Sequence, residues 1–350
     1  MTQLTHGGDW AGYRAQYGHD ALDFSANVSP LGLPQGVANA IAAALPHADR
    51  YPDPLCRALR AKLAPHEGIP AESILCGNGA ADLIFRLAWA AKPRTALVTA
   101  PTFAEYAAAL ESAGCAVRRH FLQAEVDFAV TDSILSSITP EVDMVFLCQP
   151  NNPTGQLTPL PLVERILRRC EACGALLVVD ECFLDFLPDC NALTAKALLD
   201  SKNLLILKAF TKLYGMAGVR LGYCLCANTA LLEAMQAAGQ PWAVSSLAQA
   251  AGLAALDETA YVAQVRALIA QQRPRLTAGL RALGLRVLDG RANYLLFQGP
   301  ETLGDALRQR DVVLRSCSNY PGLDGSWYRT AVRTGPENDE LLKTLAEVLA

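Results

Sequence analysis

The sequence predicts an α/β protein that has a large domain with a mostly parallel central sheet, a smaller α+β C-terminal domain and an N-terminal arm. Between residues 35 and 228, short continuous apolar runs alternate with amphipathic helical segments, which is typical of βαβ units. The first 34 residues contain many turn formers and few periodic segments. After residue 228, long helical segments lead into a few alternating strands. We therefore expect an arm over 1–34, a large domain over 35–228, and linking helices with a small domain over 229–350.

The large domain is expected to alternate helices with buried strands. Its apolar runs are short and end at glycine, proline or acidic residues, as strands covered on both faces do. The expected helices cover residues 36–48, 56–68, 80–91, 103–114 and 161–174. The expected strands cover residues 73–77, 95–100, 115–122, 143–150, 175–181, 203–210 and 219–226.

The last third of the chain has a different pattern. Two long apolar-periodic segments, residues 247–257 and 261–284, predict linking helices. Alternating residues over 294–298, 312–316 and 328–333 predict strands, and residues 338–350 predict a terminal helix. These elements indicate a small α+β domain.

Composition excludes several classes of function. The chain has 350 residues, is 51% hydrophobic and carries a net charge of −4 without any run of like charge, so no nucleic-acid or membrane surface is expected. The opening stretch MTQLTHGGDW has no hydrophobic segment, which predicts a cytoplasmic protein without a signal peptide. The eleven cysteines are expected to be reduced core residues. Cys170 and Cys173 form a lone CxxC with no second pair, so no metal site is expected.

Polar residues recur where the predicted strands end, which is the edge at which open parallel sheets bind ligands. Gly77, Asn78 and Gly79 precede a helix whose N-terminus could hold an anion, although an ordinary turn would look the same. Asn152 lies in the turn NNPTG, and Asp180 ends an apolar strand where an unpaired carboxylate would be costly.

The apolar segment over residues 204–223 adds two cations to this edge. Lys212 follows its predicted strand, and Arg220 comes eight residues later. A lysine, a carboxylate, an amide and an anion cradle together match the needs of pyridoxal 5′-phosphate. We therefore expect Lys212 to bind the cofactor aldehyde, and Thr211 and Arg220 to contact the cofactor phosphate.

The ordered motifs GNGA, PTF, NNPTG, DECF, TK and GVRLGY resemble fold type I pyridoxal-phosphate enzymes of the class I/II aminotransferase group over nearly the whole chain. The resemblance implies that Asp180 contacts the pyridine nitrogen, that Asn152 contacts the phenolate oxygen and that Phe103 stacks on the ring. It implies that the backbone amides of Gly79 and Ala80 bind the phosphate.

The resemblance also implies a homodimer. RYPDP, residues 50–54, matches a segment whose tyrosine, here Tyr51, reaches the cofactor phosphate of the other subunit. The active sites would then be composite. In two places the chain departs from the pattern of its relatives: Ala209 stands where many have Ser or Thr, and Phe183 where aminotransferases usually have Tyr. Each departure removes one hydroxyl contact to the cofactor.

Two subfamilies are similar to this chain. Histidinol-phosphate aminotransferases share RYPDP, NNPTG and the lysine segment. The threonine-phosphate decarboxylases of cobalamin biosynthesis are more similar, through HGG, DFSANVSPLG, DECFLDF and LRSCSNYPGLDGSWYRTAVR. This resemblance implies decarboxylation of L-threonine O-3-phosphate to (R)-1-amino-2-propanol O-2-phosphate, with a histidinol-phosphate aminotransferase-like activity as the alternative. The sequence does not choose between threonine phosphate and serine phosphate, which differ by one methyl group.

Such a substrate has two anionic ends, and their positions decide which bond at its α-carbon breaks. His6, Asn27, Arg315 and Arg329 are the residues we expect to hold the substrate, because arginine binds carboxylate and phosphate through two parallel hydrogen bonds. His6 and Asn27 lie on the arm, which could fold over the site. Lys212 is the nearest candidate for reprotonating the α-carbon.

Overall fold

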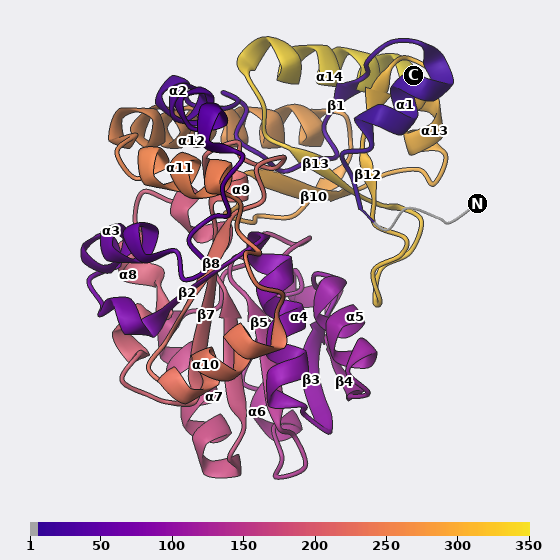
Figure 1. Ribbon diagram of the computed structural model, residues 1–350. Coiled ribbons are helices and arrows are strands. Elements are labelled where there is room, and N and C mark those ends of the chain that lie inside the picture. Colours follow the sequence, from indigo (N-terminus) through magenta and orange to yellow (C-terminus); the bar gives the residue numbers. More distant parts are fainter. Residues whose placement is uncertain (1–5) are drawn as a thin grey trace.

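The computed structural model describes residues 6–350 as two lobes, with the arm running across the upper one (Figure 1). The lower lobe is built on a seven-stranded sheet in the order β2-β8-β7-β6-β5-β3-β4. Only β8 runs antiparallel to its neighbours, so the predicted mostly parallel sheet is confirmed. The strands are β2 (Ile74–Gly77), β3 (Thr95–Ala100), β4 (Ala116–Phe121), β5 (Met144–Cys148), β6 (Leu176–Asp180), β7 (Leu204–Ala209) and β8 (Gly222–Cys226).

Helices cover both faces of this sheet because neighbouring residues of each strand point to opposite sides. Val145 and Val179 belong to one hydrophobic cluster, whereas Phe146 and Val178 belong to the other. The helices of this lobe are α3 (Arg57–Glu67), α4 (Gly79–Ala91), α5 (Glu105–Ser112), α6 (Ile134–Ser137), α7 (Leu160–Cys173), α8 (Cys190–Leu193), α9 (Phe210–Leu213) and α10 (Thr229–Ala238).

The upper lobe holds a four-stranded antiparallel sheet in the order β12-β13-β10-β9. Its strands are β9 (Arg286–Val287), β10 (Tyr294–Gln298), β12 (Arg315–Ser316) and β13 (Trp327–Ala331). Its helices are α11 (Ser246–Ala255), α12 (Thr259–Ala282), α13 (Leu303–Arg308) and α14 (Gly335–Leu349). This arrangement agrees with the α+β domain expected from the sequence.

The arm is part of the upper lobe through backbone pairing. Its strand β1 (Leu22–Asp23) pairs in parallel with β11 (Val312–Val313). The single strand expected over 312–316 is therefore wrong: β11 pairs with the arm, and β12 then pairs with β13. The arm also contains a helix that we did not predict, α1 (Trp10–Tyr17), which Asp9 caps by accepting a hydrogen bond from the Gly12 amide at 3.1 Å.

Two helices lie next to the predicted domain boundaries. Helix α10, which follows the boundary predicted at residue 228, packs against α4 of the large domain. Helix α2 (Gln35–Ala44), expected at the start of the large domain, packs mainly against the linking helix α11. These contacts show where each helix packs, and the boundaries after residues 34 and 228 stay predictions.

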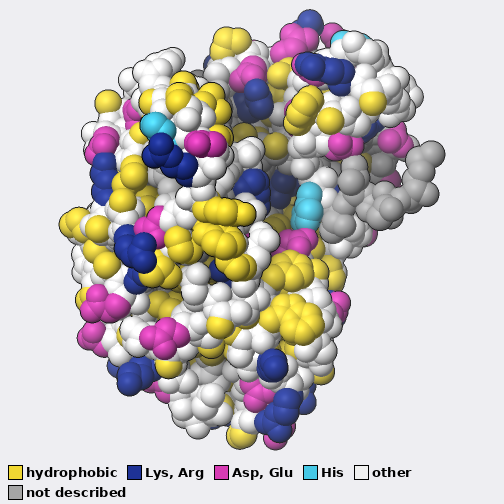
Figure 2. Space-filling view, in the orientation of Figure 1, with side chains coloured by type: hydrophobic (Ala, Val, Ile, Leu, Met, Phe, Trp, Pro, Cys, Tyr) yellow, Lys and Arg dark blue, Asp and Glu magenta, His cyan; other side chains and the backbone are white. Residues whose placement is uncertain are grey.

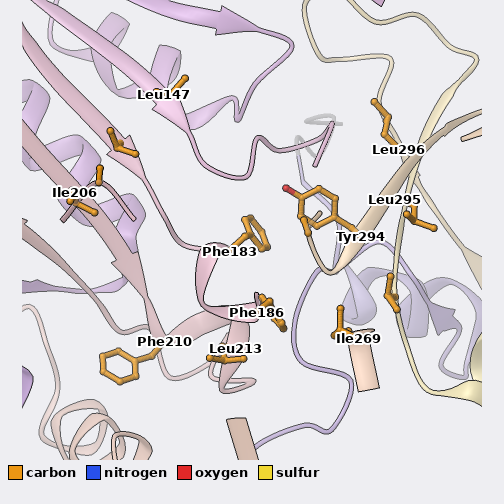
Figure 3. Packing of buried hydrophobic residues seen from close by; sticks show 14 of the residues in the cluster. Leu147, Phe183, Phe186, Ile206, Phe210, Leu213, Ile269, Tyr294, Leu295 and Leu296 are labelled. Carbon is orange, nitrogen blue, oxygen red and sulfur yellow. The ribbon is translucent and has the colours of Figure 1, made fainter. Parts of the chain in front are cut away.

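One hydrophobic cluster continues from the large sheet into the upper lobe (Figure 3). Phe183, which follows β6, meets Tyr294 of β10 edge to face, with ring centroids 5.0 Å apart. The Tyr294 hydroxyl donates a hydrogen bond of 2.9 Å to the backbone oxygen of Asn151 in the loop after β5. These contacts fix the small domain against the strand ends of the large sheet.

Neither a membrane-spanning helix nor a metal-binding cluster occurs in the part of the chain that the structure describes. No helix within residues 6–350 is long and apolar enough to cross a bilayer. Nor do these residues bring three or more His, Cys, Asp or Glu side chains together as metal ligands. The cysteines are unpaired thiols.

Candidate active site

The polar residues expected at the strand ends converge on one pocket at the carboxyl edge of the large sheet. Asp180 ends β6, Lys212 lies on α9 directly after β7, and Asn152 lies in the loop after β5. Figure 2 shows Lys and Arg side chains in the hollow between the two lobes. The pocket is lined by Ala80, Ala81, Phe103, Cys148, Asn152, Asp180, Cys182, Phe183, Ala209, Thr211, Lys212 and Arg220.

An anion cradle forms one wall of this pocket. Helix α4 begins at Gly79, whose φ of +80° suits glycine, and a Cβ there would lie 2.6 Å from Arg220 Nη2. A Cβ on Gly222 would lie 2.6 Å from the backbone nitrogen of Ala80. The two glycines thus let the Arg220 guanidinium approach the N-terminus of α4. Both are positive, so their proximity favours an anion between them.

Asp180 lies opposite this cradle and is buried. Its Oδ2 accepts a hydrogen bond of 2.6 Å from the Tyr106 hydroxyl, and its Oδ1 accepts one of 3.0 Å from the backbone nitrogen of Cys182. Burial and the neighbouring Asp180 raise the pKa of Tyr106 well above its usual range, so the phenol remains a donor. These bonds fix the orientation of the carboxylate. The sequence stretch PTFAEY contains Tyr106, but its motif predicts a role only for Phe103, which lies three residues earlier and just before α5.

The two lysines of the apolar segment have different environments. Lys208 is buried and donates to Asp185 Oδ1 at 2.8 Å, with Glu67 Oε1 at 3.8 Å. Burial alone would lower the pKa of Lys208, but these carboxylates outweigh it and raise the pKa. Lys212 is half-buried in the pocket, with its Nζ 5.4 Å from the centre of the Phe183 ring. Burial, helped by the charges of Arg329 and Arg220, lowers the pKa of Lys212 to about 8.

The lowered pKa of Lys212 predicts how the rate at which cofactor-free protein captures pyridoxal phosphate depends on pH. Only the neutral amine attacks an aldehyde, so the capture rate should rise with pH through a midpoint near 8, well below the 10.5 of an ordinary lysine. Stopped-flow absorbance over a pH series measures this midpoint. Arg329→Gln should move it upward, because a positive charge that lowers the pKa is removed. A midpoint near 10.5 in both proteins would contradict the assignment.

Arg329 of β13 is buried beside the pocket and connects three parts of the chain. Its Nη1 donates to Asn152 Oδ1 at 2.5 Å, and its Nη2 donates to the backbone oxygen of Ser25 at 2.8 Å. Asn27, with its amide oriented so that Oδ1 faces the guanidinium, accepts from Nε at 3.0 Å and from Nη1 at 3.2 Å. The structure thus brings Arg329, Asn27 and Asn152 together. Ser25 was not predicted because it acts through its backbone.

Arg315 and His6 lie at the outer part of the site. Arg315 stacks over the Tyr320 ring at 5.5 Å, and the Tyr320 hydroxyl lies 3.5 Å from Asn152 Oδ1. His6 Nε2 lies 2.6 Å from Glu105 Oε1, and its ring centroid is 5.8 Å from that of Phe103. Both residues line a second pocket, between the arm and β12. His6 therefore joins the arm to helix α5 at the mouth of the site.

Tyr51 does not line the pocket of its own chain. Its side chain is 81% exposed and stacks on Trp242, with ring centroids 4.5 Å apart. A tyrosine this exposed is compatible with a role across an interface, and that role stays a prediction. Thr211 is buried and lines the pocket, and its contact with the cofactor phosphate stays a prediction.

The residues present fit pyridoxal phosphate. The positive wall formed by Arg220 and the α4 N-terminus suits its phosphate, and Asp180 is placed to hold a proton on a ring nitrogen. Phe103 and Phe183 supply aromatic surface. Because Arg329 occupies Asn152 Oδ1, the Asn152 amide nitrogen is the group that can donate to a ligand oxygen.

Comparisons with known proteins agree with this geometry. A family model for aminotransferases of class I and II matches residues 19–346. Threonine-phosphate decarboxylase of Salmonella typhimurium is 40% identical over 332 residues, covering 94% of this chain and 91% of that protein. A histidinol-phosphate aminotransferase of Desulfitobacterium hafniense is 34% identical over 345 residues, with 94% and 92% covered. The solved histidinol-phosphate aminotransferase of Clostridium acetobutylicum is similar at a TM-score of 0.87 and 28% identity, covering 93% of this chain and 98% of that chain.

Proposed function

The chain belongs to the class I and II aminotransferase family, has the fold type I architecture and uses pyridoxal 5′-phosphate, and we propose that it decarboxylates L-threonine O-3-phosphate. The product would be (R)-1-amino-2-propanol O-2-phosphate, as an intermediate of cobalamin biosynthesis. The 40% identity to the Salmonella decarboxylase supports this choice over the aminotransferases, since the two from Desulfitobacterium hafniense are 34% and 32% identical.

The observation that carries the proposal is a pair of arginines on one sheet. Arg315 of β12 lies directly opposite Arg329 of β13 in the antiparallel register. Residues opposite one another project from the same face, and like charges in such a pair are destabilising. Two anionic groups of a substrate would compensate both guanidinium groups. A phosphorylated amino acid has one phosphate and one carboxylate, and arginine binds either.

The chain's residues divide the work of the reaction. Pyridoxal phosphate, when bound, supplies a ring that accepts the electrons released at the substrate α-carbon. Asp180 keeps a proton on the ring nitrogen, and Tyr106 and the Cys182 amide fix the orientation of Asp180. Arg220 and the N-terminus of α4, which lie close together, would hold the phosphate of the cofactor.

Lys212 lines the pocket, so it would hold the cofactor and would stand next to the reacting carbon of a bound substrate. With a pKa lowered to about 8, it can give a proton back to that carbon near neutral pH. Arg329 is held on three sides, by Asn152, Asn27 and Ser25, so the anion that it binds has a defined direction. The direction of this bound anion decides which bond to the α-carbon of the substrate is aligned to break.

We also place this activity in a cytoplasmic homodimer with composite active sites. The surface position of Tyr51 supports this arrangement, because its ring contributes nothing to the pocket of its own chain. Within the chain itself, the Ser29 amide donates to the backbone oxygen of Lys212 at 2.8 Å, which joins the arm to the catalytic helix α9.

The test is the reaction itself. Incubation with L-threonine phosphate, without any keto acid, should release carbon dioxide and a phosphorylated amino alcohol. Threonine without phosphate should react poorly because it lacks one of the two anionic groups that the arginines would bind. A parallel mixture of histidinol phosphate and 2-oxoglutarate should give no glutamate. Glutamate from that mixture, with no carbon dioxide from the first, would assign the aminotransferase activity instead.

A further inference from the structure

Two large aromatic side chains stack on the surface instead of in the core. Tyr51 follows α2 and is 81% exposed, and Trp242, in the loop between α10 and α11, is 44% exposed. Their ring centroids are 4.5 Å apart and their planes differ by 25°. Hydrophobic side chains gather on the face of the molecule beside the hollow (Figure 2). A side chain as exposed as Tyr51 has few neighbours that restrict its rotamers, so the stack with Trp242 is a main constraint on its ring.

The backbone holds Trp242 in an unfavourable conformation. Its φ is +56°, in the left-handed region that bulky residues rarely adopt. Such a conformation persists where the surrounding structure enforces it, often at functional sites. Gln249 of α11 provides one such constraint: its Nε2 donates to the backbone oxygens of Val244 at 3.0 Å and of Asp53 at 2.9 Å. One side chain thereby joins the Trp242 loop to the Tyr51 segment.

We propose that Trp242 is a positioning residue that orients Tyr51 toward the cofactor phosphate of the partner subunit. The inference rests on the proposed homodimer, and it adds a residue to which no role had been assigned. Trp242 acts through Tyr51, so its effect must appear in the site of the partner and not in the site of its own chain. A residue that only stabilised its own subunit would not show this asymmetry.

Hybrid dimers with a single Lys212 distinguish a positioning role of Trp242 from a purely structural role. One chain keeps Lys212, and the other carries Lys212→Ala, so the remaining site receives Tyr51 from the lysine-free chain. Trp242→Ala in the lysine-free chain should weaken cofactor affinity about fivefold, the size expected for a lost aromatic pair. The same change in the lysine-bearing chain should have no effect. Trp242→Phe should restore most of the affinity.

Affinity is measured from the visible absorbance of the Lys212-bound cofactor during titration, separately from turnover. Trp89→Ala, an exposed tryptophan on α4, serves as the matched control and should have no effect in either chain. Tyr51→Phe, placed either in the lysine-free chain or in the lysine-bearing chain, tests the composite active site independently of Trp242. If only Tyr51→Phe depends on the chain that carries it, the role of Trp242 is wrong. If neither Tyr51→Phe nor Trp242→Ala depends on the chain that carries it, both the composite active site and the role of Trp242 are wrong.

Discussion

Replacing Lys212 by alanine should lower kcat more than about a thousandfold, because proton transfer by one positioned group already contributes roughly 10²- to 10⁴-fold. The variant should also lose covalent attachment of the cofactor. The protein should stay folded, since Lys212 is half-buried and its lowered pKa reflects a cation that the fold disfavours. Activity assays and the visible spectrum of the purified variant measure both losses.

Borohydride reduction locates the attachment site in the wild-type protein. Trypsin does not cleave after a modified lysine, so a label on Lys212 gives the peptide over residues 209–220, and a label on Lys208 gives residues 203–212. We expect the first, because Lys208 is charged and ion-paired with Asp185. Recovery of the second peptide, or of no labelled peptide, would reject the cofactor assignment.

Replacing Arg329 by glutamine should lower kcat/KM for L-threonine phosphate by about 30-fold to several thousandfold. This range corresponds to roughly 2–5 kcal/mol, the usual cost of removing one partner of a buried charge pair. Asn152, Asn27 and the Ser25 backbone would lose the same donor, so the arm should also bind less tightly to the site. Steady-state kinetics measure the first effect.

Arg333→Gln is the matched control for Arg329→Gln. Arg333 lies four residues further along and donates to Glu337 and to the backbone oxygen of Asp23. Its loss should lower thermal stability and leave KM for the substrate unchanged. If the two variants had the same kinetics, Arg329 would be a structural residue and the proposed substrate grip would be wrong.

The sequence by itself determined the class of fold and the chemical set of the site. A continuous apolar run was enough to predict β3 with its observed bounds, because a strand buried on both faces leaves such a pattern. Alternation was enough to predict β10 with its observed bounds. The order of motifs along the chain also determined the family. Asp180, Asn152 and Lys212 could be chosen because each lies at or shortly after the end of a strand, where the sheet edge brings such residues together.

Only the tertiary structure decided what surrounds these residues. Asp180 faces the pocket and Tyr106, whereas the adjacent Glu181 points away to Thr194 and the Ala195 amide. The pairing of β1 with β11 joins segments from opposite ends of the chain. Local patterns carry no information about such contacts, since they arise only when distant segments pack together. The partners of Arg329 and the stack of Tyr51 on Trp242 became visible for the same reason.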